Sequence, residues 1–302
     1  MHLGRDRPGA TAWCDRASKA TTEPRICANH ALCVLALGRT LGAAPYSATH
    51  RCSVPAHPEA SVHPSHGRLQ PSEEGLNQNY LIKSLPRADK ARLLSICEPV
   101  TLVLSEVLCE PGKATRHVYF PTEGFISLVT LVPDHPGLEV GMVGREGMVG
   151  AQLALGVATA PLRALVQGSG AAWRIGARAF SAELARSKSL RRGLDRYLYV
   201  LMMQLSTSAA CLRYHRIGPR LARWLLMTQD RARADTFHVT QEFLAYMLGV
   251  RRVGVTAAAG ELQREGLIEY SRGELTVLNR SGLEAAACTC YAADRQNYSD
   301  VL

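Results

Sequence analysis

The chain has 302 residues and a mass of 32.8 kDa, and 47% of the residues are hydrophobic, 20% charged and 6% aromatic. This composition can fill one or two ordinary cores, and it excludes a fully disordered chain. The longest apolar run, residues 31–38, ends at Arg39, well short of the roughly 18 uncharged apolar residues that a membrane-spanning helix needs. We therefore expect a soluble globular protein.

The cysteines argue against a secreted scaffold. There are nine, an odd number, and their spacing is irregular, whereas disulfide frameworks use paired cysteines at regular spacing. We therefore expect a cytoplasmic protein in a reducing environment.

The basic residues concentrate toward the C-terminus. The net charge is +9, and residues 188–302 carry 16 Lys and Arg against 11 Asp and Glu. Arginine binds phosphate through two parallel hydrogen bonds, so this surplus favours nucleic acid as a partner. The alternative explanation of this surplus is a charged surface that contacts only solvent.

Residues 1–75 have no helical or strand periodicity and are rich in Pro, Ser, Ala and His, so we expect a disordered extension. A signal peptide and an upstream extension from a misassigned start codon are alternatives, although Arg39 interrupts the apolar run of the former. Four cysteines in this segment lack the tight spacing of iron–sulfur ligands, so no cluster is expected. They are Cys14, Cys27, Cys33 and Cys52.

Residues 76–187 change to short apolar runs divided by Gly and Pro, after a predicted helix at residues 79–91. Several short strands at this spacing predict a β-roll or sandwich. The expected strands cover residues 100–104, 107–108, 118–120, 125–132, 138–143 and 162–166.

Residues 188–212 form a predicted long helix. Leucines recur along it at alternating intervals of four and three, the spacing of a coiled-coil seam. The seam residues are Leu194, Leu198, Leu201, Leu205 and Leu212. We expect this helix to form a dimer; an amphipathic helix packed on its own domain is the alternative.

Residues 213–290 contain a predicted helix-turn-helix. Thr240 caps a first helix, Gly249 ends it, and a second helix starts at Arg251 or Arg252 and ends near Gly266. A hairpin with its turn at residues 271–273 follows, which makes the motif winged, and residues 291–302 are expected to be a tail.

A motif of this kind places the start of its second helix in the major groove of DNA. Arginines there bond guanine or phosphate, a helix N-terminus suits phosphate, and the wing tip meets the backbone. The predicted DNA-binding residues are Arg251, Arg252, Thr256, Thr240, Gln241 and Arg272.

The order of these parts resembles the Crp/Fnr superfamily of bacterial transcription regulators. Residues 249–268 align without gaps with the family's recognition helix, and residues 110–112, 120–124 and 143–150 resemble the turns of its roll. The resemblance implies an α+β fold with an N-terminal double-stranded, jelly-roll-like β-roll, a long dimerisation helix and a C-terminal winged helix-turn-helix. It also implies a homodimer that binds double-stranded DNA, with a small effector and RNA polymerase as further partners.

Two departures limit this resemblance. Family members that read DNA through an Arg-Glu-x-x-x-Arg arrangement have its residues where this chain has Arg252, Val253 and Ala257, so we expect a different operator. The positions of the family's charged cyclic-nucleotide-binding residues hold uncharged residues in this chain. One arginine lies nearby, but it is shifted by an odd number of strand residues and therefore points to the opposite face of the strand. This degenerate effector pocket consists of Gly150, Ala160, Pro161 and Arg163, and we expect cyclic-nucleotide binding to be lost.

Enzyme chemistry has little support, because the chain lacks the P-loop, zincin, nucleophile-elbow and dinucleotide-binding motifs. A small-molecule-binding or metal-dependent cupin-like barrel is the alternative function, but the roll has only His117 and His135 as imidazole ligands. Cys288 and Cys290 are interpreted as small buried hydrophobes, with a redox or metal pair as the alternative. We therefore expect no enzyme activity, cofactor or bound metal.

Overall fold

Two short helices begin the part of the chain that the computed structural model describes, residues 78–135 and 137–302. They are α1 (Tyr80–Lys83) and α2 (Arg87–Ser95), where the sequence predicted one helix. The break lies at Pro86, because a proline disfavours helical backbone in the residue before it. Asn79 caps α1 by accepting a hydrogen bond from the Leu81 backbone N–H at 3.0 Å. The extension expected over residues 1–75, with its four cysteines, lies outside the described residues.

Seven strands form the two sheets of a β-roll, as predicted. The first sheet has the order β1 (Glu98–Leu102), β7 (Gly170–Gly176), β3 (His117–Pro121). The second has the order β2 (Val107–Cys109), β6 (Arg163–Gly168), β4 (Phe125–Thr130), β5 (Leu138–Val143). All neighbouring strands are antiparallel. The sequence did not predict β7, whose Gly and Ala residues have low strand propensity.

Strand β3 separates two hydrophobic cores because successive side chains of a strand point to opposite faces. Val118 and Phe120 pack on one face with Phe180 of helix α3 (Ala177–Arg186). Tyr119 packs on the other face with Ile126 of β4. The roll therefore packs against helices on one side and closes on its second sheet on the other.

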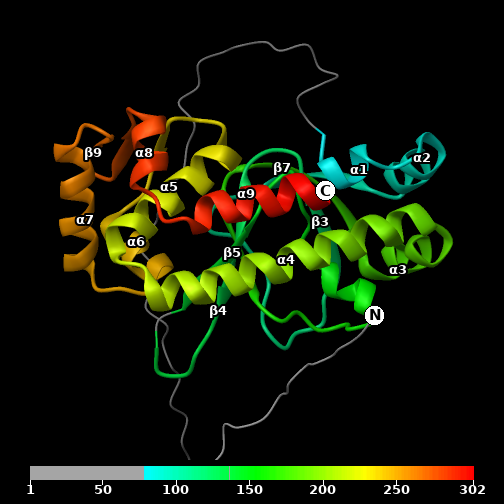
Figure 1. The fold of residues 1–302 in the computed structure, drawn as a ribbon. Helices are drawn as coiled ribbons and strands as arrows, with labels where there is room; N and C mark the ends of the chain where they lie inside the picture. The colour runs from blue at the N-terminus through cyan, green and yellow to red at the C-terminus, as the bar shows by residue number, and fades with distance from the viewer. Residues whose placement is uncertain (1–77, 136) are drawn as a thin grey trace, which may run out of the picture. The chain divides into compact units, whose positions relative to one another are not determined.

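Helix α4 (Lys188–Tyr214) is the long helix that the sequence predicted. Ser187 caps it by accepting a hydrogen bond from the Leu190 N–H at 3.1 Å. Helix α9 (Cys290–Val301) packs along α4 (Figure 1), and the Gln204 amide lies 3.4 Å from the Tyr298 hydroxyl. The residues expected to form a C-terminal tail are therefore a helix.

The predicted leucine seam lies at the border between the buried and the exposed faces of α4. Leu194 is fully buried in the core of its own roll, and Leu201 packs against the roll's other core. Leu198, Leu205 and Leu212 are half-buried. Leu194 therefore has no surface to offer a partner, because its domain already covers it.

An exposed apolar stripe runs along α4 beside those leucines. Met202 is 60% exposed, and Ala209 is exposed as well. Together with the three half-buried leucines they continue at intervals of four and three, which is a coiled-coil spacing. We name Leu198, Met202, Leu205, Ala209 and Leu212 the α4 stripe.

The C-terminal domain combines helices with a small sheet. Its helices are α5 (Ile217–Ala232), α6 (Gln241–Leu248), α7 (Arg252–Arg264) and α8 (Arg280–Ala286). Its sheet has the order β8 (Thr236–His238), β10 (Glu274–Val277), β9 (Ile268–Ser271). The sequence did not predict β8, which has only three residues. No helix among the described residues has both the length and the apolarity to cross a membrane.

The C-terminal domain packs on the second sheet of the roll. Phe125, Val129 and Met142 of that sheet share one core with side chains of α5, α6 and α7. Two polar contacts cross the same boundary. The Trp224 indole donates a hydrogen bond to Glu139 at 3.0 Å, and Arg231 pairs with Glu146 at 2.7 Å.

Candidate nucleic-acid interface

A tight turn joins α6 to α7 in the predicted way. The Thr240 hydroxyl accepts a hydrogen bond from the Phe243 N–H at 3.1 Å and so begins α6. Gly249 ends α6 with a φ of 62°, in the left-handed region that glycine adopts without strain. A Cβ at this position would lie 2.6 Å from Leu138 Cδ1. Glycine is therefore needed both for the turn and for the close approach to β5.

Helix α7 buries one face and exposes the other. Its inward residues are Val255, Ala258, Ala259 and Leu262. The outward side of its first turns carries Arg252, Val253, Thr256 and Ala257. The helix therefore presents a small, mostly uncharged surface that begins with a guanidinium.

Three predicted DNA-binding arginines are exposed and lack an acidic partner. Arg251, Arg252 and Arg272 form no ion pair with any residue in the described ranges, whereas Arg174 and Arg223 are both paired. Five N–H donors on each unpaired guanidinium can therefore bind phosphate oxygens or the edge of a guanine.

Thr256 and Gln241 link the two helices of the motif. The Thr256 hydroxyl lies 2.6 Å from the Gln241 side-chain oxygen and 3.1 Å from the Arg252 carbonyl oxygen. A hydroxyl has one hydrogen, so it donates to one of these two acceptors at a time. The sequence did not predict this contact, which holds the start of α6 beside the first turns of α7.

Arg272 lies at the tip of the wing. Ser271 and Glu274 pair across the hairpin, which leaves Arg272 and Gly273 as a two-residue turn with φ angles of 51° and 85°. Two positive φ angles in succession define the type I′ turn that suits twisted antiparallel strands. The turn directs the Arg272 side chain into solvent, where it is exposed.

The predicted effector positions offer no free charge. Gly150 has a φ of 94°, and a Cβ there would lie 2.7 Å from Val118 Cγ1. Ala160 is buried, and Pro161 is exposed. The Arg163 guanidinium makes two contacts with the Glu110 carboxylate, at 3.0 and 3.1 Å. Its charge is therefore already neutralised within the roll.

A cavity of about 1490 Å³ lies elsewhere, bordered by α1, α4 and α9. None of the four predicted effector-pocket residues lines it. Its walls include Arg145, Arg192, Arg196 and Arg295.

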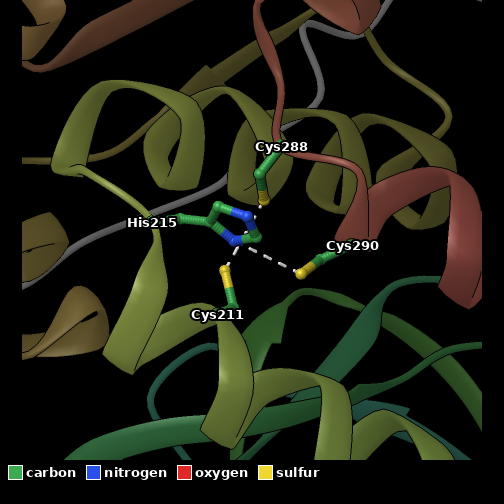
Figure 2. A group of neighbouring side chains, drawn as sticks. All are labelled: Cys211, His215, Cys288 and Cys290. Carbon is green, nitrogen blue, oxygen red and sulfur yellow. Dashed lines mark hydrogen bonds between the residues drawn. The ribbon is translucent and has the colours of Figure 1, made fainter.

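Cys288 and Cys290 are buried, and the fold brings them to two further metal-binding side chains. Cys211 Sγ lies 3.5 Å from Cys288 Sγ, and His215 Nδ1 lies 3.5 Å from Cys290 Sγ (Figure 2). No other group of three or more His, Cys, Asp or Glu side chains in the described ranges is placed to hold a metal. Cys211 and His215 were not predicted, because their Cys-x-x-x-His spacing supplies only two of the four side chains.

Residues 219–286 match the family model of the Crp-like helix-turn-helix domain. A search of curated proteins found no significant match.

Solved structures of Crp/Fnr regulators share the fold. A putative crp/fnr-family transcriptional regulator from Eubacterium rectale is 16% identical with a TM-score of 0.55, and the match covers 68% of this chain and 96% of that one. FixK2 from Bradyrhizobium japonicum is 14% identical with a TM-score of 0.54, covering 64% and 98%. A CRP-family transcriptional regulator from Thermus thermophilus is 21% identical with a TM-score of 0.52, covering 62% and 96%.

At these identities the structural likeness establishes the fold, while the family model identifies the DNA-binding part. The chain therefore contains a Crp-like helix-turn-helix domain at residues 219–286 and shares the fold of solved Crp/Fnr regulators.

Proposed function

We propose that this protein is a Crp/Fnr-type transcription regulator that acts in the cytoplasm as a homodimer and binds a two-fold-symmetric operator through α7 and the wing. The supporting observation is the set of three exposed, unpaired arginines at the start of α7 and at the wing tip. The α4 stripe supplies the dimer contact. Two-fold symmetry then places the half-sites one helical turn apart, about 34 to 36 Å between centres.

We further propose that base reading rests on one charged side chain and two small apolar ones. Arg252 is the first residue of α7, where its planar group can make two hydrogen bonds to one guanine. Val253 is 72% exposed and Ala257 is also exposed, so both can contact the methyl group of thymine. The operator should therefore differ from those read through an Arg-Glu-x-x-x-Arg arrangement.

Arg252→Ala and Arg272→Ala should weaken DNA binding in different ways. Loss of a base contact at Arg252 should cost about 1 to 3 kcal/mol on the preferred operator and relax specificity at one base pair of each half-site. Loss of a phosphate contact at Arg272 should weaken binding to all sequences alike. It should also lower the slope of the logarithm of the binding constant against the logarithm of the salt concentration by about one. Binding titrations on operator variants at several salt concentrations measure both effects.

Arg264→Ala is the matched control, because Arg264 is exposed at the other end of α7. It removes the same charge far from the proposed base contact and should leave specificity unchanged. Equal, sequence-independent losses from Arg252→Ala and Arg272→Ala would contradict the reading role of Arg252. The bases would then be read by Arg251 or Thr256.

We propose that the roll has lost cyclic-nucleotide binding. The family's acidic and basic contacts correspond here to Gly150, Ala160 and Pro161, and Arg163 is paired with Glu110. A phosphate would have to displace that carboxylate from the guanidinium. Calorimetric titration with cyclic AMP and cyclic GMP should therefore show no binding, and micromolar affinity for either would refute the proposal.

A further inference from the structure

Four side chains with metal-binding atoms meet where α4 ends. Cys211 is in the last turn of α4, and His215 directly follows that helix. Cys288 lies between α8 and α9, and Cys290 is the first residue of α9. Their ligand atoms, one from each residue, all lie within 4.8 Å of one another. Figure 2 shows the three thiols directed toward the His215 imidazole.

The spacing of these atoms matches that of a tetrahedral zinc site. With Zn–S bonds of about 2.3 Å and Zn–N bonds of about 2.0 Å, tetrahedral ligands lie about 3.5 to 3.8 Å apart. The Cys211–Cys288 sulfur pair and the Cys290–His215 pair are each separated by 3.5 Å. A single ion fits between ligand atoms this close, whereas an iron–sulfur cluster with several iron atoms would force them apart.

The kinds of ligand point to the same metal. Three thiolates and one imidazole form the Cys₃His set of structural zinc sites, which have no open coordination position. Thiolates are soft ligands, which disfavour magnesium and calcium. All three cysteines are buried and His215 is half-buried, so protein side chains surround the group.

A nearby buried cation supports an anionic centre here. Arg220 is buried, donates a hydrogen bond to the Leu248 carbonyl and forms no ion pair with a described carboxylate. Burial lowers the pKa of its guanidinium, and interaction with Cys211 and Cys288 opposes that effect. Three thiolates around Zn²⁺ carry one net negative charge, which would offset the cost of burying this cation.

The position of the cluster indicates what a metal would do. The Cys288 N–H donates a hydrogen bond to the Pro219 carbonyl, so the α8–α9 link already touches the start of α5. The match to the helix-turn-helix model ends at residue 286, before Cys288 and Cys290. We propose that Cys211, His215, Cys288 and Cys290 bind one Zn²⁺ ion, which fixes the α4–α5 junction to the C-terminal helix α9.

The first test measures the metal in full-length protein purified without a histidine tag or chelator. Elemental analysis by mass spectrometry should find one zinc per chain. Replacement by Co²⁺ should give the visible bands of tetrahedral cobalt with a thiolate-to-cobalt charge-transfer band. Cys288→Ser with Cys290→Ser should abolish both signals.

Two control variants keep the four proposed ligands and should retain one zinc per chain. Cys97→Ser with Cys109→Ser removes the other two cysteines of the described chain. A second control replaces the cysteines of the N-terminal segment, Cys14, Cys27, Cys33 and Cys52, with serine.

His215 provides a test that does not depend on a variant that fails to fold. His215→Cys should retain zinc through a Cys₄ set, whereas His215→Ala should weaken zinc binding in chelator competition. That weakening should exceed the roughly 10- to 100-fold cost of losing an outer-shell partner, because a direct ligand is lost.

Three results would overturn the proposal. The first is no stoichiometric zinc after reconstitution of the reduced wild-type protein. The second is unchanged zinc in the Cys288→Ser, Cys290→Ser variant. The third is a Cys211–Cys288 disulfide in metal-free protein isolated under reducing conditions. That result would make these two cysteines a redox pair and not zinc ligands.

Discussion

Replacing Met202 and Leu205 with glutamate should convert the proposed dimer to monomers and weaken operator binding by about 10²- to 10⁴-fold, the gain that joining two binding modules provides. Both residues lie on the α4 stripe, where Met202 is exposed and Leu205 half-buried in the single chain. In a symmetric seam each new carboxylate would lie near its own copy. Sedimentation velocity measures the mass, and titrations on a full operator and on one half-site measure the loss.

Arg196→Glu is the matched control for this variant. It also changes the net charge by −2, and Arg196 is exposed on α4 away from the stripe. The control should remain dimeric and bind the full operator normally. An intact dimer in the Met202→Glu, Leu205→Glu variant would place the interface elsewhere in the molecule.

The contribution of Glu139 to stability should fall as pH rises, because the environment of its half-buried carboxyl group favours the protonated form. Glu139 of β5 accepts hydrogen bonds from the Trp224 indole and the Ser127 hydroxyl. Burial raises its pKa from 4.5 to about 7, although Arg231 and Arg223 partly oppose this. Between these two pH values the folded state holds a proton that the unfolded chain releases, so unfolding becomes easier as pH increases.

Glu139→Gln should remove this pH dependence. The amide is neutral at every pH, so the variant should match the wild type near pH 4.5 and exceed it above pH 7 by about 3 kcal/mol. Urea unfolding at several pH values measures the difference. Glu242→Gln, at an exposed site on α6, should leave the pH profile unchanged. Equal profiles for Glu139→Gln and the wild type would show that Glu139 is not the responsible group.

The helix-turn-helix could be predicted because its signals are local. Each signal determines the backbone within a few residues of itself. The signals are a capping threonine at Thr240, a glycine that tolerates positive φ at Gly249, and small inward residues on the second helix. Strand β7 was missed because its small residues owe their burial to partners on β1 and β3 that lie about 50 to 76 residues earlier.

The buried face of α4 was not predicted, because part of it is polar. Gln204 and Ser208 are buried there, and the Gln204 side-chain oxygen accepts a hydrogen bond from the Met142 N–H at 3.3 Å. Apolar periodicity assigns such polar positions to the solvent-facing side of a helix. The predicted seam therefore followed the leucines instead of the buried face. Only the contacts with β5 and α9 show which side of the helix faces the core.

The cysteine–histidine group was beyond a reading of short motifs. Cys211 and His215 lie more than 70 residues before Cys288 and Cys290 in the sequence. Antiparallel packing of α9 on α4 brings the two halves together, and each half alone supplies only two of the four side chains.

The ion pair between Glu146 of the roll and Arg231 of α5 makes an intermediate position of the C-terminal domain unfavourable. Both side chains are largely buried, and the Gly144 N–H also donates a hydrogen bond to Glu146. If the two charges moved a few ångströms apart, they would lose their mutual attraction while both were still shielded from water, which is energetically unfavourable. Domain movement at this boundary should therefore occur as a switch between two discrete arrangements rather than as a gradual tilt.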